Sequence, residues 1–375
     1  MQFLIETLQA VTWQHVVMWI IGLVLIWLAI KKEMEPALLL PIGFGAILVN
    51  IPFSNVLTEA VGEGEAAAGG AGIIQWLFEV GIEALPILLF IGIGAMIDFE
   101  PLIVNPKLMI LGAFAQIGIF VTIILASLLG FNINDAASIG IIGAADGPTS
   151  ILVAMKLASQ YVGPIMVVAY SYMALVPIIQ PSVIKLITTK KERRIRMDYT
   201  TKHASKTVKI LFPIVITLIS GLIAPKSLAL VGFLMFGNLL SECGVLPSMA
   251  DTAKNNLANL ITLLLGITIA FQMQAESFLR WDTLMIMVLG LFAFVFDTVG
   301  GVLCAKVMNL FSKKKINPMI GAAGISAFPM SARVVHKIGL KEDPSNYLLM
   351  HAVGANVSGQ IASAIVGGLI IGLVL

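Results

Sequence analysis

Two apolar segments of the chain are interrupted near their middle in the same way. Residues 142–150 read IGAADGPTS, and residues 320–329 read IGAAGISAFP. The run LMI at 108–110, ahead of the first segment, recurs at 284–286 ahead of the second. Paired hydrophobic segments broken by glycine and proline in matching halves are the best pointer in a sequence to the ion or substrate site of a transporter. The sequence therefore indicates where a site lies before it indicates what the site does.

The composition places the chain in a membrane. Hydrophobic residues make up 58% of the sequence and charged residues only 12%, against roughly 25% charged residues in soluble domains. Several apolar runs reach the roughly 20 residues that a helix needs to cross a bilayer. The first run ends at Lys31 and Lys32 in place of a small-residue cleavage site, and no basic residue precedes it, so it does not resemble a signal peptide. We expect an all-α polytopic membrane protein.

About ten segments are apolar enough to span the bilayer, at 12–30, 36–53, 84–98, 108–130, 162–187, 209–223, 228–241, 256–276, 284–310 and 346–374. Lysine and arginine concentrate in cytoplasmic loops. The densest basic cluster lies within 188–208, which we therefore assign to the cytoplasm together with Lys31, Lys32 and 313–315. Residues 54–75 contain three glutamates and no lysine or arginine, which indicates an external loop.

The two interrupted segments, 136–158 and 317–337, are predicted to be re-entrant hairpins. The first is flanked by loops poor in basic residues, whereas the second has basic residues on both sides. Each therefore enters and leaves on one side, and arms of about 11 residues would reach about 16 Å, half the hydrocarbon thickness. The tips of the two hairpins should meet near the midplane. Two proline-kinked full spans remain an alternative, because Lys156 weakens the charge argument.

This topology predicts inverted-topology repeats within one membrane domain over 1–375. We divide it into N-terminal spans and an external loop (1–80), a first repeat (84–187), the basic cytoplasmic loop (188–208) and a second, inverted repeat (256–375).

Oxygen-bearing side chains at the two interruptions predict a cation site. A break in the membrane survives only where it lines a cavity or meets a ligand, and an intramembrane carboxylate such as Asp146 is a functional-site hypothesis by default. Carboxylate, hydroxyl and carbonyl oxygens suit a small hard cation. The candidates are Asp146, Thr149, Ser150 and Ser326. Asp146 could also cap the helix that begins near Pro148.

Further polar residues lie in or beside apolar segments. Asn317 and Asn356 offer amide oxygens, although each could equally join two helices. Tyr172 follows the first hairpin and could line a pathway or anchor a span. Asp297 lies among phenylalanines near the centre of its span, where it could be a protonated structural residue, a partner of Arg333 or part of a proton path.

Arg333, His336 and Lys337 share one helical face just inside the cytoplasmic surface. Positive-inside anchoring explains such residues, as does an anion receptor, because arginine binds a carboxylate through two hydrogen bonds. Residues 154–157 read AMKL and resemble a biotin-attachment motif, but Lys156 lies in a membrane segment and not on an exposed β-hairpin. Cys243 and Cys304 lack metal-binding spacing and read as packing residues.

Four longer motifs resemble a known family. They are 140–149 (GIIGAADGPT), 169–177 (AYSYMALVP), 315–321 (KINPMIG) and 348–352 (LLMHA). They closely resemble the beta subunit of sodium-translocating, biotin-dependent decarboxylases, which act on oxaloacetate, methylmalonyl-CoA, glutaconyl-CoA or malonate. The resemblance extends from about residue 85 to the end of the chain.

The resemblance implies a function within a complex in the bacterial cytoplasmic membrane. A carboxyltransferase alpha subunit would move CO2 from the substrate to biotin on a separate biotin-carrier subunit, and a small subunit would serve as a membrane anchor. This chain would decarboxylate carboxybiotin and export Na+, with a proton consumed. Ala355 stands where the oxaloacetate branch carries proline. Together with the short external loop, this favours an acyl-CoA complex, with glutaconyl-CoA or methylmalonyl-CoA as substrate.

The resemblance also implies roles for individual residues. Arg333, Tyr172 and Asp146 would be catalytic, and Arg333, Asn317 and Ser326 would bind carboxybiotin; the sodium ligands would be Asp146, Thr149, Gly321, Ser326 and Asn356. Two other functions remain open. A stand-alone sodium/anion symporter or sodium/proton exchanger would need no biotin carrier, and a non-catalytic scaffold would tolerate neutral intramembrane residues.

Overall fold

The computed structural model describes residues 2–33, 36–54, 56–59, 70–197 and 203–375. Of the predicted external loop, residues 55 and 60–69 lie outside this part, as do residues 198–202 of the predicted cytoplasmic loop. The N-terminal part comprises α1 (Gln2–Gln9), α2 (Trp13–Lys32), α3 (Pro36–Val49), the short antiparallel strands β1 (Thr58–Glu59) and β2 (Gly70–Ala71), and α4 (Ile73–Gly81).

The remaining elements of the described chain are all helices. Residues 84–187 form α5 (Ala84–Met96), α6 (Glu100–Val104), α7 (Leu108–Phe114), α8 (Ile117–Leu128), α9 (Ile133–Gly140), the 3-10 helix η1 (Ile141–Ala144), α10 (Gly147–Lys156) and α11 (Val162–Ile187). They are followed by α12 (Lys190–Arg193), α13 (Lys206–Ile223), η2 (Pro225–Ser227) and α14 (Leu228–Cys243). The C-terminal part comprises α15 (Pro247–Asp251), the π-helix η3 (Thr252–Leu257), α16 (Ala258–Ile269), η4 (Ala270–Met273), α17 (Ala275–Phe278), α18 (Trp281–Phe311), α19 (Met319–Ala322), α20 (Met330–Glu342) and α21 (Leu349–Val374).

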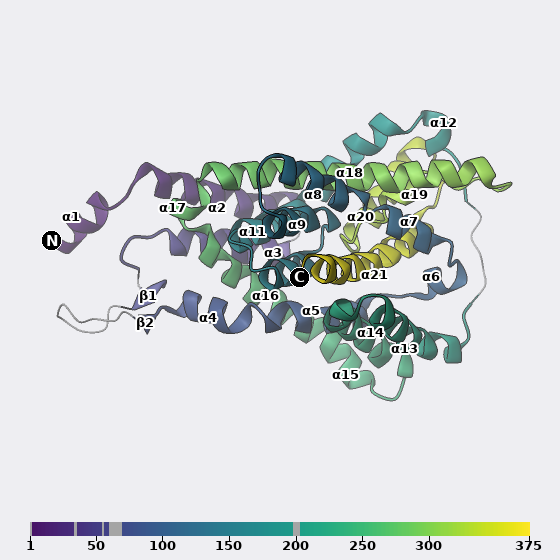
Figure 1. Cartoon of the computed structure of the whole chain (residues 1–375), viewed down its shortest axis with the longest axis horizontal. Coiled ribbons are helices and arrows are strands. Elements are labelled where there is room, and N and C mark those ends of the chain that lie inside the picture. The colour runs from purple at the N-terminus through teal and green to yellow at the C-terminus, as the bar shows by residue number, and fades with distance from the viewer. Residues whose placement is uncertain (1, 34–35, 55, 60–69, 198–202) are drawn as a thin grey trace.

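The arrangement is that of an all-α polytopic membrane protein. Eight helices or helix pairs among the described residues are long and apolar enough to cross a bilayer, and the bent pair α4–α5, with an angle of 66°, makes nine. The predicted span at 36–53 corresponds to α3, an apolar helix of only 14 residues that falls below the length required for this count. Figure 1 shows α18 along the long axis, with α1, β1 and β2 at one end of the molecule and α12 towards the other. The ends of the predicted external and cytoplasmic loops thus lie far apart, and the side of the membrane that each faces stays a prediction.

The first predicted hairpin, formed by α9, η1 and α10, is confirmed. Hydrogen bonds join the start of its first arm to the residues that follow its second. Asn134 Nδ2 donates to the carbonyl of Leu157 at 3.1 Å, and Ser159 Oγ donates to Asp135 Oδ1 at 2.6 Å. The segment therefore enters and leaves at one place, and its ten-residue second arm rises about 15 Å. A full span would separate these residues by the thickness of the membrane.

The second predicted hairpin, formed by α19, the irregular residues 323–329 and α20, is confirmed in the same way. Asn317 precedes its first arm and Asn346 follows its second, yet both side-chain amides donate to the carbonyl of Arg193 at 2.9 Å. Both ends of this hairpin therefore lie beside α12. The inverted relation between the two halves of the chain stays a prediction.

Glycines let the helices that surround the hairpins approach closely. A Cβ added to Gly94 of α5 would overlap the carbonyl of Leu234 in α14, whose carbon would lie only 2.8 Å away. Gly237 of α14 stands in the same relation to Ile91 of α5. Small residues at a crossing are the usual means of packing helices in membranes, where no hydrophobic effect draws them together.

Candidate functional site

The tips of the two hairpins meet, as the sequence predicted. The backbone N–H of Ser326 in the second hairpin donates to the carbonyl of Ala144 in the first, at 3.1 Å. The first hairpin breaks here because Ala145 adopts the left-handed region with φ 51° and Asp146 turns extended before α10 begins. A residue in this region ends a helix and leaves carbonyl groups without partners in the helix. The break therefore places backbone oxygens beside a carboxylate.

Asp146 is the centre of the hydrogen bonds at this break. Its side chain is 2% exposed. Oδ2 accepts from Thr149 Oγ1 at 2.7 Å, from Ser363 Oγ at 3.0 Å and from Gln360 Nε2 at 3.2 Å. Asp146 also caps α10, but the cap bond from the Thr149 N–H to Oδ1 is long, at 3.5 Å. The capping and ligand interpretations are therefore compatible, because Oδ1 has no short bond.

The second hairpin and α21 add further oxygens. Ser326 Oγ donates to the carbonyl of Gly359 at 3.0 Å, and Asn356 Nδ2 donates to the carbonyl of Ile325 at 2.6 Å. The other amide atom, Asn356 Oδ1, is buried and has no hydrogen-bond partner among the described residues. A buried acceptor without a donor is costly. A hard cation such as sodium satisfies an oxygen of this kind.

A cavity of about 210 Å³ lies beside Asp146. Ser326, Gln360 and Tyr170 line it together with Asp146, and Asn259 and Thr262 of α16 complete its polar wall. Tyr170 is 1% exposed, and its hydroxyl has no partner among the described residues. The cavity can thus hold a hydrated ion or water next to the carboxylate.

Tyr172 lies elsewhere. Its hydroxyl donates to the carbonyl of Met287 in α18, and its ring packs against Gly290. The structure thus brings Tyr170 to the cavity, while Tyr172 joins α11 to α18. Ser150 is also turned away from the carboxylate, because its hydroxyl donates to the carbonyl of Asp146 at 2.8 Å.

Asn317 and Gly321 belong to the base and the first arm of the second hairpin. Asn317 Nδ2 donates to the carbonyls of Arg193 and Ile195, and its Oδ1 accepts from the N–H of Met319. A Cβ on Gly321 would lie 2.9 Å from the Val302 nitrogen of α18, so the arm rests directly on that helix. Both residues shape the hairpin.

Arg333 and Lys337 project from α20 with exposed side chains, as expected for a charged face at the cytoplasmic mouth. His336, between them, lies near the Tyr347 ring at 6.2 Å. Asp297 is fully buried, and its carboxylate approaches the space above Gly118 and Gly143, where an added Cβ would lie 2.6 and 2.7 Å away. It forms no ion pair with Arg333 among the described residues.

Sequence reasoning missed five polar side chains at this site: Gln360, Ser363 and Tyr170, and Asn259 and Thr262 in the cavity wall. Gln360 and Ser363 follow Asn356 by four and seven residues, which places all three on one face of a helix. That spacing in an otherwise apolar span was the available signal. Tyr170 carried no signal that separated it from Tyr172.

Comparisons with known proteins identify the family of the chain. The sequence model of the family described as "Na+-transporting oxaloacetate decarboxylase beta subunit" matches residues 14–374. Methylmalonyl-CoA decarboxylase subunit beta of Propionigenium modestum is 49% identical, covering 96% of this chain and 94% of the relative. Glutaconyl-CoA decarboxylase subunit beta of Acidaminococcus fermentans is 48% identical (97% and 94%), and the oxaloacetate decarboxylase beta chain of Klebsiella pneumoniae is 43% identical (96% and 95%).

Proposed function

The chain belongs to the family of Na+-transporting oxaloacetate decarboxylase beta subunits, and on that premise we propose that it decarboxylates carboxybiotin and couples the reaction to sodium export. The observation that carries the proposal is the meeting of two broken hairpins at Asp146, within a cavity lined by oxygen atoms. Such a site can release an ion to either side when one hairpin moves against its surroundings.

We assign the complex to the acyl-CoA type. Identity to the methylmalonyl-CoA and glutaconyl-CoA beta subunits is 48–49%, against 42–44% to the oxaloacetate chains. The alignment with the Klebsiella pneumoniae chain also extends over 411 positions, more than the 375 residues of this chain, so insertions separate the two. The substrate is then an acyl-CoA such as methylmalonyl-CoA or glutaconyl-CoA, bound by another subunit.

The sodium site that we propose contains Asp146, Thr149, Ser326, Asn356 and Gly321. Asp146 supplies the charge, Thr149 and Ser326 supply hydroxyl oxygens, and Asn356 supplies the amide oxygen that lacks a partner. Gly321 acts through the close packing of its arm on α18. The first four residues supply hard oxygen ligands, as a small cation requires, and Gly321 positions the arm that precedes Ser326.

Carboxybiotin reaches the chain at the cytoplasmic mouth. Arg333 is exposed there and can bind the carboxylate through two hydrogen bonds. Leaving water for a less polar site favours the loss of neutral CO2, and the biotin nitrogen then needs a proton. Tyr172, between α11 and α18, is the residue to which we assign the coupling of this proton to the hairpins. Asn317 supports the same mouth by holding the base of the second hairpin.

The partners follow from this chemistry. A biotin-carrier subunit delivers carboxybiotin, a carboxyltransferase alpha subunit loads the carrier, and a small subunit anchors the assembly in the bacterial cytoplasmic membrane. Biotin is not attached to this chain.

The test uses the complete complex reconstituted into vesicles. Asp146→Asn should abolish sodium-dependent decarboxylation and uptake of radioactive sodium, and Arg333→Ala should lower the rate at a given carrier concentration. Asp251→Asn is the matched control, because it neutralises an exposed carboxylate that accepts a local hydrogen bond from Asn255. Full activity of the Asp146→Asn complex would refute the site. Solute-driven sodium flux by the chain alone would instead identify a secondary symporter or exchanger.

A further inference from the structure

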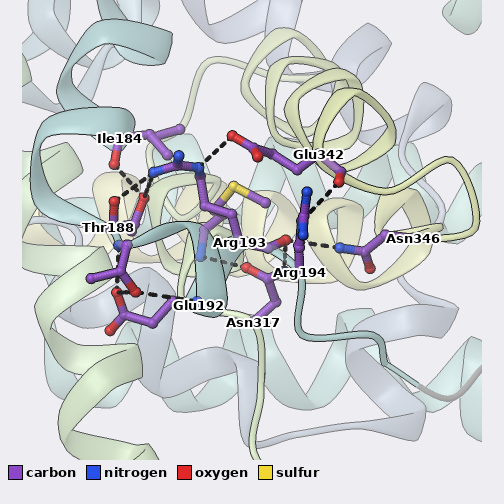
Figure 2. A network of polar contacts seen from close by, with 10 residues as sticks. Ile184, Thr188, Glu192, Arg193, Arg194, Asn317, Glu342 and Asn346 are labelled. Carbon is purple, nitrogen blue, oxygen red and sulfur yellow. Dashed lines mark hydrogen bonds and ion pairs between the residues drawn. The ribbon is translucent and has the colours of Figure 1, made fainter.

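The segment from Thr188 to Met197, directly after α11, lies against both ends of the second hairpin. Figure 2 shows Asn317 from one end and Glu342 and Asn346 from the other converging on Arg193 and Arg194. These ends are 25 residues apart in sequence along the hairpin, from Asn317 to Glu342. We call residues 188–197 the clamp.

The backbone of the clamp accepts hydrogen bonds from both flanks. The carbonyl of Arg193 accepts Nδ2 of Asn317 and Nδ2 of Asn346, each at 2.9 Å, and the carbonyl of Ile195 accepts Asn317 Nδ2 at 2.9 Å. Asn317 and Asn346 are both fully buried. A single peptide group thus fixes the distance between the two ends of the hairpin.

The side chain of Arg193 holds that peptide group in place. It is 8% exposed, and its Nε pairs with Glu342 Oε1 at 2.8 Å, while Nη1 donates to the carbonyl of Thr188 at 2.5 Å. Arg194 Nε also donates to the carbonyl of Glu342, at 3.1 Å. Removing one partner of a partly buried ion pair leaves the other charge with less compensation. The guanidinium therefore determines where the clamp can sit.

A second ion pair lies nearer the surface, where Arg196 donates to both carboxylate oxygens of Asp343, at 2.6 and 3.0 Å. The Arg196 hydrogen bond lowers the pKa of Asp343, so this contact stays charged at neutral pH. Glu192 pairs with Lys306 at 3.0 Å and joins the clamp to α18. The clamp is thus connected to α11, α18 and α20.

The two hairpins differ in how their ends are held. The ends of the first are bonded to each other through Asp135, which accepts from Ser159 and Gln160. The ends of the second are bonded to the clamp. The tip of the second hairpin is held separately: Asn356 Nδ2 donates to the carbonyl of Ile325 at 2.6 Å, Ser326 bonds to Gly359 and Ala144, and Gln180 Nε2 donates to the carbonyl of Ala322 at 2.7 Å. The base and the tip of the second hairpin therefore fix its position together.

We propose that Arg193 is a positioning residue for the sodium site: through the clamp it holds the second hairpin so that Ser326 stays against Ala144 and Asp146. The inference rests on the proposed function of that site. If the base loosens, only a fraction of molecules has the tip in place, and the apparent sodium dissociation constant rises by the inverse of that fraction.

The experiment compares variants within the complete complex. Arg193→Ala should raise the half-saturating sodium concentration by about tenfold, equivalent to about 1.4 kcal/mol, with the maximal rate at saturating sodium changed less than about twofold. Equilibrium binding of radioactive sodium should show the same shift. Arg193→Lys keeps the charge but cannot make both contacts at once, so its shift should be intermediate. Lys191→Ala is the matched control, since it removes an exposed positive charge from the same short helix and should leave the sodium dependence unchanged.

The outcomes are distinguishable. Wild-type sodium dependence in an assembled Arg193→Ala complex would overturn the inference, as would an equal shift in Lys191→Ala. A loss of maximal rate without a change in half-saturation would also overturn it, because that pattern describes general destabilisation. If Arg193→Ala does not assemble, Glu342→Gln, which removes the charge and keeps the shape, gives the same test. Sodium binding that survives in the Asp146→Asn complex would instead refute the proposed sodium site itself.

Discussion

Replacement of Gly147 by alanine tests whether the cavity beside Asp146 is as narrow as the structure shows. A Cβ at this position would lie 2.5 Å from Cε1 and 2.7 Å from Cε2 of Tyr170. Carbon atoms in contact prefer about 3.5–4.0 Å, so the ring would have to retreat by at least about 1 Å. Tyr170 is buried within packed side chains, and overpacking of this kind costs about 1–3 kcal/mol.

The strain falls directly beside Asp146, so we expect it to act mainly on sodium binding. A coupling of about 1–3 kcal/mol corresponds to about 5–150-fold in affinity, and we expect Gly147→Ala to raise the half-saturating sodium concentration by at least about fivefold. The assay is sodium-dependent decarboxylation by the reconstituted complex. Gly372→Ala is the control, because nothing lies within 4 Å of a Cβ there.

A second substitution, at Tyr170, tests whether the strain comes from the contact with this ring. Tyr170→Leu shortens the side chain against which the new methyl group presses, so the double variant should recover sodium affinity relative to Gly147→Ala alone. Normal sodium dependence in Gly147→Ala would show that Tyr170 does not face the break in the working protein. Failure of the double variant to recover would show that the strain has another source.

Two further predictions concern the frame around the site. Gly94→Ala should lower the thermal stability of the purified chain by overpacking the α5–α14 crossing, at a cost of about 1–3 kcal/mol, whereas Gly232→Ala, with open space around its Cβ, should be neutral. Equal melting temperatures would contradict this. Lys209, which donates to Glu100 at 2.8 Å, holds the pKa of Glu100 below its ordinary value. A lowered folded-state pKa stabilises the fold above the unfolded pKa, about 4.3, and the benefit disappears as pH falls through the folded value. Stability of the wild type relative to Glu100→Gln should therefore be constant near neutral pH and decline below about pH 4; a difference that grows on acidification would reverse the sign.

The two hairpins could be predicted from the sequence because the signals that indicate them are local. Glycine and proline interrupt apolar runs at Asp146 and near Ser326, and the charge of the flanking loops indicates which side each segment enters. Both signals can be read without knowing any long-range contact. The meeting of the tips then follows from arm length alone.

The rest of the site depends on helix rotation and distant contacts. Tyr170 and Tyr172 are two residues apart, or about 200° around a helix, so only packing decides which of them faces Asp146. Gln360 and Ser363 look like ordinary polar residues of an apolar span until α21 is placed beside the first hairpin. Asn317 shows the same limit, because its partner Arg193 is 124 residues away. No local pattern contains that pairing.

The charges at the cavity explain why a monovalent cation suits it. Asp146 is the sole ionisable carboxylate among the residues that line the cavity, and no lysine or arginine joins it there. One sodium ion beside one carboxylate leaves the site neutral, whereas a divalent ion would leave an uncompensated positive charge in a medium of low dielectric constant. In the site that we propose, the partnerless amide oxygen of Asn356 would stabilise the ion without adding charge. The neutral filled site can pass between the two sides of the membrane at lower electrostatic cost than the empty, charged one, which is the property that a sodium pump requires.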